Sequence, residues 1–331
     1  MESATLTSAP LVDSRLKNAR DWLQGLGLNI QSDFVSVAGD ASFRRYFRVQ
    51  VNGESRVLMD SPPPSLDIRP FIDVDHRLIS AGLHAPEIFY QDRDNGYLLL
   101  EDLGDDLYRN LLNSKNADSI FPDLFEVLKT FALEVDTTGL PDFDPGKLQR
   151  DMDLFPDWYL SKHRKTLKRV QLDRVWQGFC EQIIEAALQQ PQCFVHRDFH
   201  SCNLLKCGDE PLGIIDFQDA VIGPITYDFI SLIWDRYITW PRDQLEIWME
   251  EIRLLFKLDI EPAQWRRYCD LMGLQRNFKI VGIFARLYYR DGKIGYLEMI
   301  PRFYEYITST LRHYPEFAEV LFIMEQTECA P

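Results

Sequence analysis

The sequence predicts an α+β protein with a small antiparallel-sheet lobe over residues 1–103 and a larger, mostly helical lobe over residues 104–331. Segments rich in β-forming residues, separated by tight turns, fill the first hundred residues. Helical periodicity dominates after Gly104 and is interrupted by two short strand-like segments around a polar loop. A length of 331 residues, about two typical domains, fits this division.

The first lobe begins with apolar residues at helical spacing, which predict a helix over residues 12–26, closed by glycines. Strands are predicted over 34–37, 43–51 and 56–59, and the Asn52-Gly53 pair predicts a hairpin between the last two. After three prolines, apolar residues from Ile68 to Ile79 predict a helix that ends before Gly82. Two further strands follow, over 87–90 and 97–100.

The second lobe contains long helical patterns over residues 105–136, 150–189, 225–257 and 262–310, the last with internal breaks. Short strands are predicted at 193–195 and 212–215. The last pattern has apolar residues at alternating spacings of four and three, which is typical of a helix face packed into the core: Leu274, Phe278, Val281, Ala285 and Tyr288.

Composition excludes several classes of protein. With 46% hydrophobic and 26% charged residues the chain is typical of a globular protein. A net charge of −15 repels phosphate backbones and anionic lipids, so we expect neither a nucleic-acid nor a membrane partner. The six cysteines form no Cys-x-x-Cys pair, and the chain shows neither a signal peptide nor a membrane-spanning apolar run. We expect a cytoplasmic monomer.

The chemistry-bearing motif is His196-Arg197-Asp198, with Asn203 five residues after the aspartate and Asp216 thirteen residues after the asparagine, behind an apolar strand. This spacing matches the catalytic loop and metal-binding aspartate of protein kinases, and it predicts a protein-kinase-like bilobal fold that uses ATP. The alternative is a chance tripeptide on a solvated turn. Two matching parts in the right order, after a β-rich lobe, favour the kinase interpretation.

Each residue of the motif has a role that phosphoryl transfer requires. Mg²⁺ prefers carboxylate and amide oxygens, so Asn203 and Asp216 are the predicted metal ligands. An acceptor hydroxyl must lose its proton, and the Asp198 carboxylate is the predicted acceptor for it. His196 and Arg197 are predicted to organise the loop.

Nucleotide contacts are predicted at two places in the first lobe. Residues 39–49 lie between two strands and resemble a phosphate-covering loop with one glycine. An exposed basic edge strand is the alternative for its arginines. Residues 98–104 resemble a hinge whose backbone binds adenine. The predicted nucleotide contacts are Ser42, Phe43, Arg44, Arg45, Glu101 and Leu103.

Together these residues resemble the aminoglycoside phosphotransferase and choline kinase group, whose members phosphorylate small molecules on a kinase-like fold. The interval of twelve residues between Asp216 and Asp228 leaves no room for a protein-kinase activation loop. Asp228, in its Gly-Pro-x-x-Tyr-Asp setting, is similar to the aspartate that supports the catalytic loop in that group.

The chain is more closely similar to the bacterial anomeric kinases for N-acetylmuramate and N-acetylglucosamine, at residues 39–46, 57–63, 154–159 and 216–220. This resemblance implies transfer of the ATP γ-phosphate to the C1 hydroxyl of an amino sugar during cell-wall recycling, with Mg²⁺. Two alternatives remain: a kinase for another small alcohol, such as an aminoglycoside or amino alcohol, and an inactive pseudokinase that acts as a binding module.

The chain departs from the kinase pattern where a strand lysine would contact the phosphates, because Met59 occupies that position. The inter-lobe helix offers Asp73 and Asp75 but no glutamate to pair with such a lysine. For the sugar, aromatic side chains would form a wall and an arginine would bind a carboxylate, although core packing is the alternative for each aromatic residue. The candidates are Trp158, Tyr159, Trp234, Arg150, Arg236 and Arg290.

Overall fold

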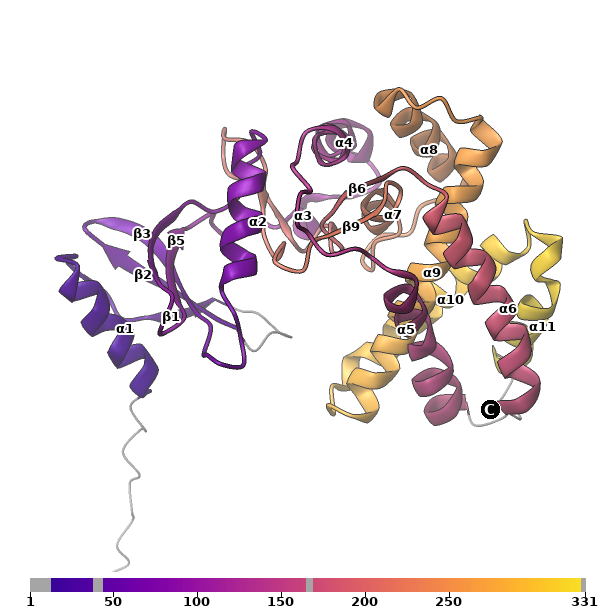
Figure 1. Cartoon of the computed structure of the whole chain (residues 1–331), viewed down its shortest axis with the longest axis horizontal. Coiled ribbons are helices and arrows are strands. Elements are labelled where there is room, and N and C mark those ends of the chain that lie inside the picture. The colour runs from indigo at the N-terminus through magenta and orange to yellow at the C-terminus, as the bar shows by residue number, and fades with distance from the viewer. Residues whose placement is uncertain (1–12, 38–43, 165–168, 329–331) are drawn as a thin grey trace, which may run out of the picture.

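The computed structural model describes residues 13–37, 44–164 and 169–328. A sheet region and a helical region lie next to each other (Figure 1). The sheet has the order β1-β2-β3-β5-β4, and all its neighbouring strands are antiparallel. Its strands are β1 (Val35–Val37), β2 (Arg45–Val51), β3 (Glu54–Asp60), β4 (Ile88–Asp92) and β5 (Tyr97–Glu101).

The predicted hairpin between β2 and β3 is confirmed. Asn52 and Gly53 both have positive φ, at 54° and 87°, which is the backbone of the tight turns that Asn-Gly pairs favour. The turn sets the register, so that Val51 pairs with Glu54 and, farther along, Tyr46 pairs with Met59. Because neighbouring residues of a strand point to opposite faces, Arg45 and Tyr46 point to opposite sides of the sheet.

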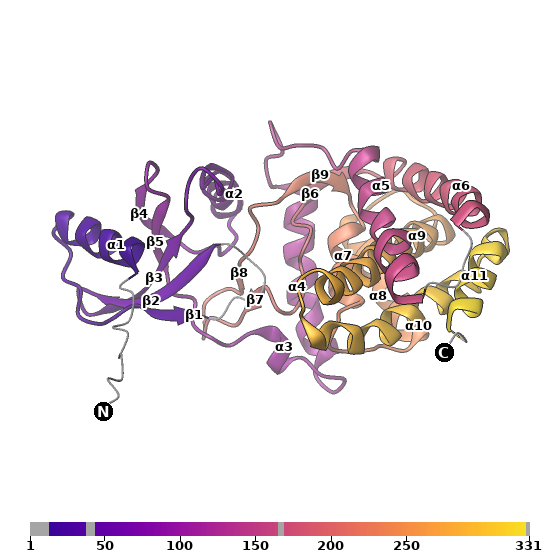
Figure 2. The ribbon, with the colours of Figure 1, turned by 90° about the horizontal axis from the view of Figure 1, so that it is seen from below.

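The two faces of the sheet are covered by two helices. On one face, Phe47, Leu58 and Tyr97 pack against Ala19 of α1 (Ser14–Gly25). On the other face, Met59 belongs to the main core together with Phe71 of α2 (Arg69–Ser80). Helix α1 therefore lies on the outer side of the sheet, and α2 lies on the side of the helical region (Figure 2).

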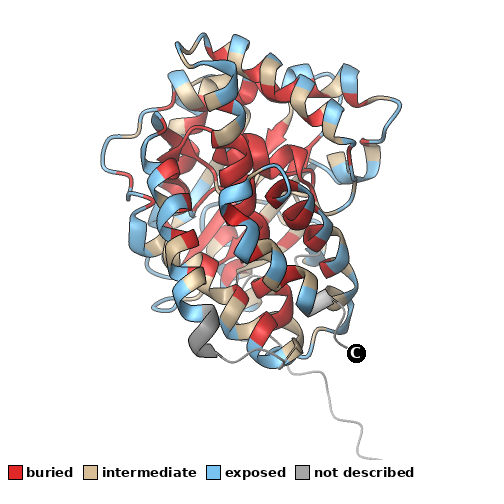
Figure 3. Ribbon diagram, turned by 90° about the vertical axis from the view of Figure 1, so that its right-hand side faces the viewer, coloured by how far each residue is buried: buried red, intermediate tan, exposed pale blue. Residues whose placement is uncertain are grey.

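The helical region is built around α9 (Pro262–Tyr289), a 28-residue helix that contacts most of the other helices of this region and is buried along much of its length. Figure 3 shows the buried segments gathered in the middle of the molecule. Close packing of α9 depends on glycine: a Cβ on Gly282 would lie 2.3 Å from the backbone of Leu154. The other helices are α3 (Tyr108–Leu111), α4 (Ala117–Leu133), α5 (Pro145–Leu154), η1 (Phe155–Arg164), α6 (Arg169–Leu188), α7 (Tyr227–Ile233), α8 (Arg242–Phe256), η2 (Ile294–Met299), α10 (Ile300–Leu311), η3 (Pro315–Phe317) and α11 (Ala318–Glu328).

The predicted long helices are divided in the structure. The pattern over 225–257 becomes α7 and α8, with Pro241 as the N-cap of α8. Proline lacks an N–H to donate, so it is favoured at a helix start, where that N–H would have no partner in the helix. Among the described residues, no helix combines the length and the apolar character that a membrane span requires.

Two small antiparallel pairs hold the polar loop between the sheet and the helices. Strand β6 (Gln192–Val195) pairs with β9 (Val221–Pro224), and β7 (Leu204–Leu205) pairs with β8 (Gly213–Ile214). The sequence analysis does not predict β9, because glycine and proline are atypical of strands. The predicted motif therefore lies in the loop that connects these two pairs.

Candidate active site

The motif loop begins at the end of β6 and is held by Asp228 at the start of α7. The Asp228 carboxylate accepts the backbone N–H groups of His196, at 2.5 Å, and of Arg197, at 3.0 Å. Arg197 has a φ of 78°, a conformation that side chains disfavour. The two hydrogen bonds from one buried carboxylate stabilise this strained backbone, so Asp228 supports the loop without facing a ligand.

His196 links the loop to the segment that carries Asp216. Its Nδ1 accepts the N–H of Asp198 at 3.3 Å, and its Nε2 donates to the carbonyl of Ile215 at 3.0 Å. This pattern fits one neutral tautomer. Burial lowers the pKa of His196, which keeps the ring neutral. The residue therefore fixes geometry and does not transfer a proton.

Asn203 brings the predicted catalytic and metal-binding positions together. Its Nδ2 donates to the backbone carbonyl of Asp198 at 2.9 Å and lies 3.5 Å from Oδ2 of Asp216. Asp216, with a φ of 65°, is held on its other oxygen by Gln218 Nε2 at 3.0 Å. Because the nitrogen of the Asn203 amide is committed to these contacts, its Oδ1 is left available for another partner.

This donor set fits Mg²⁺, which takes oxygen ligands, needs few from the protein and keeps several waters. The Asp216 carboxylate and the Asn203 amide oxygen supply one ligand each beside exposed space at Asp216. In the described part of the chain, no three or more His, Cys, Asp or Glu side chains lie together so that they could hold a metal ion.

Asp198 is ionised despite its burial. Burial alone raises its pKa, but the positive charges of Lys279 and Arg276, together with the nearby His200, outweigh this effect and hold the pKa below the usual range. Both cations lie on α9. The sequence analysis considers only the apolar face of this helix and therefore misses Arg276 and Lys279.

The segment after α7 is attached to the motif loop. Asp235 accepts the backbone N–H of Ser201 at 3.1 Å and also its hydroxyl. The next residue, Arg236, donates from Nη2 to Nε2 of His200 at 3.1 Å. Burial and the charge of Arg236 lower the pKa of His200 to about 4, so this imidazole is neutral. Arg236 is the substrate candidate that the fold brings to the motif loop.

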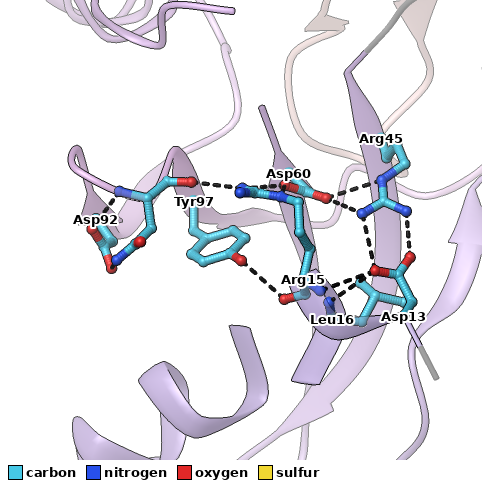
Figure 4. Close-up of polar contacts among 8 residues, drawn as sticks. Asp13, Arg15, Leu16, Arg45, Asp60, Asp92 and Tyr97 are labelled. Atoms are coloured by element: carbon cyan, nitrogen blue, oxygen red, sulfur yellow. Dashed lines mark hydrogen bonds and ion pairs between the residues drawn. The ribbon is translucent and has the colours of Figure 1, made fainter. Parts of the chain in front are cut away.

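The predicted phosphate contacts have different outcomes. Ser42 and Phe43 lie outside the described residues. Arg44 donates to the carbonyl of Asp67 at 3.3 Å. Arg45 contradicts the prediction, because Asp13 and Asp60 bind its guanidinium on the α1 side of the sheet (Figure 4). Tyr46 points to the opposite side of the sheet, which packs against the main core.

Tyr46 is a candidate site residue that the sequence analysis misses. It shares a sheet face with Met59, its cross-strand partner, and Met59 occupies the position of the missing lysine. Burial and the negative charge of Asp216 raise the pKa of Tyr46 to about 12, whereas Arg44 lowers it. The phenol therefore lies within electrostatic range of the predicted metal ligand. Counting back from the Asn52-Gly53 turn pairs residues 46 and 59, and this signal could have identified it.

The predicted hinge follows β5. The Glu101 side chain lies 3.2 Å from His84 Nε2, and its backbone N–H donates to Glu87 at 2.9 Å. The Leu103 side chain packs so closely on β8 that a Cβ on Gly213 would lie 2.8 Å from it. Within the described ranges, the N–H of Leu103 has no hydrogen-bond acceptor. It is thus available to a nucleobase.

Burial argues against two of the predicted sugar contacts. Tyr159 and Trp234 are each 1% exposed and belong to the main core. Trp234 lies so flat against α9 that a Cβ on Gly273 would be 1.4 Å from its ring. These large side chains fill space that the surrounding helices create.

The other substrate candidates lie elsewhere. Trp158 is half-buried against the core, Arg150 is exposed on α5, and Arg290 pairs with the neighbouring Asp291 at 2.7 Å. None of these contacts connects them to the motif loop.

Relatives of known function resemble the chain along most of its length. It is 39% identical over 324 residues to the N-acetylmuramate/N-acetylglucosamine kinase of Pseudomonas aeruginosa, covering 93% of this chain and 95% of the relative. It is 41% identical over 291 residues to the kinase of the same name from Pseudomonas putida, with 86% of each chain covered.

Solved structures share the fold. A choline/ethanolamine kinase family protein from Mesorhizobium loti has a TM-score of 0.64 at 17% identity, covering 94% of this chain and 99% of that one. The GDP complex of aminoglycoside 2′-phosphotransferase-IIIa has a TM-score of 0.62 at 17% identity, with coverages of 88% and 98%. The predicted kinase-like α+β fold is confirmed.

The model of the phosphotransferase enzyme family matches residues 33–266, a range that includes the sheet, the hinge and the whole motif loop. This range and the identity to the kinases lead to the same assignment: the chain belongs to the phosphotransferase enzyme family.

Proposed function

We propose that this protein transfers the γ-phosphate of ATP to the anomeric C1 hydroxyl of N-acetylmuramate and N-acetylglucosamine, as a step of cell-wall recycling in the cytoplasm. The observation that carries the proposal is the link that Asn203 makes between Asp198 and Asp216, at 2.9 and 3.5 Å. Because Asn203 contacts the backbone carbonyl of Asp198 and the carboxylate of Asp216, it supports a site in which a proton acceptor lies near two oxygen ligands. The similarity to two kinases of that printed name supports the choice of sugars.

The nucleotide occupies the space between the sheet and the motif loop in this proposal. The free N–H of Leu103 binds the base, and Arg44 and Tyr46 lie on the side of the phosphates. Asp216 and Asn203 hold Mg²⁺, which neutralises charge on the phosphate oxygens. The segment up to residue 103 thus binds the nucleotide, and residues 104–331 supply catalysis and the sugar site.

Asp198 orients the sugar hydroxyl and accepts its proton as the bond to phosphorus forms. Because nearby cations hold the pKa of this carboxyl below its usual range, it is ionised before the substrate arrives. Its hydrogen bond to the hydroxyl strengthens as the oxygen becomes more acidic in the transition state. A weakly basic carboxylate therefore serves mainly to position the acceptor.

The experiment is an acceptor screen with the purified protein, ATP and Mg²⁺. N-Acetylmuramate and N-acetylglucosamine should release ADP, and phosphorus NMR should show the product phosphate coupled to the anomeric proton. An aminoglycoside or amino alcohol serves as the competing acceptor. A phosphate on any other carbon, or a preference for the competing acceptor, contradicts the proposal.

A pseudokinase is the second candidate, and one observation favours it: Met59 replaces the strand lysine with a buried apolar side chain. A binding module of this kind would bind ATP without turnover with any acceptor. The same screen separates the two candidates, because a pseudokinase releases no ADP with either sugar.

A further inference from the structure

Helix α9 carries two buried cations on the side of the motif loop. Lys279 is 8% exposed, and its Nζ donates to the Tyr227 hydroxyl at 3.1 Å and lies 3.4 Å from Asp151. Arg276 is 5% exposed. Within the part of the chain that the structure describes, its guanidinium makes no hydrogen bond or ion pair. None of its nitrogens belongs to the fully buried side-chain atoms without a partner, so the guanidinium reaches open space. A ligand that enters this space could accept hydrogen bonds from its five N–H donors.

The geometry of α9 places Arg276 beside the motif loop. Gly273, Arg276 and Lys279 follow one another at intervals of three residues, so they lie on neighbouring parts of one side of the helix. Gly273 contacts the ring of Trp234, and Lys279 contacts Tyr227. Arg276 therefore lies between the start of α7 and the segment that follows α7.

Both of these neighbours are attached to the motif loop. Asp228, next to Tyr227, binds the amides of His196 and Arg197, and Asp235, next to Trp234, binds Ser201. Asp198 and Asp235 are accordingly among the groups that act on the charge of Arg276. The guanidinium therefore lies within electrostatic range of Asp198, the predicted proton acceptor.

Resting on the proposed function, we propose that Arg276 binds the carboxylate of the lactyl group at C3 of N-acetylmuramate. A guanidinium and a carboxylate match as two parallel hydrogen bonds, so this pairing is strong and specific. The neighbouring cations are committed elsewhere, Lys279 to Asp151 and Arg236 to His200. N-Acetylglucosamine has a hydroxyl at C3, so it gains nothing from this contact.

The test is the ratio of kcat/KM for the two sugars. Arg276→Gln should lower kcat/KM for both sugars by a shared factor, because Arg276 also stabilises ionised Asp198. N-Acetylmuramate should lose about 10- to 100-fold more than N-acetylglucosamine, mainly through KM, because it alone loses a charge-assisted hydrogen bond. Arg276→Lys keeps the positive charge but loses the two parallel N–H donors. It should restore part of the kcat/KM that N-acetylmuramate loses in Arg276→Gln.

A matched control lies on the same helix. Arg266 is exposed and lies 3.8 Å from Glu246, away from the motif loop. Arg266→Gln should leave the ratio between the two sugars unchanged. If Arg276→Gln lowers kcat/KM equally for both sugars, the arginine acts on Asp198 or on the transferred phosphate, and the carboxylate proposal is wrong.

A substrate-side measurement avoids any folding defect of the variants. The native protein should use the methyl ester of N-acetylmuramate about 10- to 100-fold less well than the free acid. An ester that is phosphorylated as well as the acid overturns the proposal. A native protein that phosphorylates neither N-acetylmuramate nor N-acetylglucosamine contradicts the proposed function instead, so the two failures are distinguishable.

Discussion

Two charge clusters of this protein differ in how completely their members are paired. In the sheet region, buried Asp60 is bound by Arg15 and Arg45, and Asp13 binds Arg45 from the other side (Figure 4). The second cluster, in the helical region, is formed by Asp198, Arg276 and Lys279, and buried Arg276 has no close partner among the described residues. The first cluster fastens α1 and β2 to β3, whereas the second stays open to a ligand.

The difference shows why charge alone does not identify a phosphate or sugar contact. Arg45 and Arg276 are both arginines next to regions of predicted function. Asp60 and Asp13 already neutralise Arg45, so a phosphate would have to displace two carboxylates. Arg276 needs no such displacement. Incomplete pairing of a buried charge is therefore the more useful sign of a binding role.

The largest expected effect on catalysis is at Asp198, in the second cluster. Asp198→Asn removes the proton acceptor while keeping its size, so kcat should fall by about 10²- to 10⁴-fold. The Kd for ATP should change by less than about threefold, because the loss concerns the transition state. Steady-state kinetics and calorimetric titration with ATP measure the two quantities. Unchanged ADP release would show that position 198 takes no part in turnover.

A second test concerns Asp75 on α2, a fully buried carboxyl whose two oxygens have no hydrogen-bond partner in the part of the chain that the structure describes. Burial, followed by the charge of Glu101, raises its pKa to about 7 from 3.8. Between these pH values the unfolded chain releases the proton and the folded chain keeps it, so the free energy of unfolding falls as pH rises.

Asp75→Asn should remove this contribution. We compare the free energy of unfolding of the variant with that of the native protein at each pH. The variant-minus-native difference should be about 2–4 kcal/mol larger at pH 8 than at pH 4. Urea denaturation at both pH values gives the comparison, and effects of other titrating groups cancel between the two proteins. A difference that does not change with pH would mean that Asp75 has a partner in solution.

A substitution in the first cluster, which contains Asp60, should lower the stability of the protein and leave its catalysis nearly unchanged. Asp60→Asn removes a buried carboxylate that two half-exposed arginines bind, which should lower the free energy of unfolding by about 2 kcal/mol. The folded fraction should keep its kcat within about twofold. Thermal denaturation and active-site-normalised kinetics test both statements. A loss of kcat with unchanged stability would place the Asp60 cluster at the phosphates after all.

The smallest expected effect is at Tyr46, which lies with Met59 on the α2 side of the sheet. Tyr46→Phe removes a hydroxyl near Asp216 and should lower kcat/KM for ATP by about 5- to 10-fold. Tyr90 on β4 is exposed, and Tyr90→Phe is the matched control that should have no effect. Equal ATP kinetics in both variants would assign Tyr46 to packing alone.

The sequence predicted the parts of the site that depend on chain spacing. Asp198 and Asn203 are five residues apart, and Asp216 follows after the β7–β8 pair, so local structure brings them together. Chain spacing could not predict the burial of Tyr159 and Trp234, because the sequence does not distinguish an aromatic residue in a core from one in a sugar site. Their burial depends on helices that are distant in the sequence.

By itself, the sequence determined the α+β fold, the hairpin at Asn52-Gly53 and the motif loop with its phosphotransferase chemistry, since these depend on periodicity, turn residues and local spacing. Only the tertiary structure decided which arginines are paired. Arg45 meets Asp13 and Asp60 because β2 alternates its side chains between the faces of the sheet. Arg276 lies beside the motif loop, without a partner among the described residues, because Gly273 lets α9 approach Trp234. For these two arginines, the packing of segments that are distant in the sequence decides the pairing.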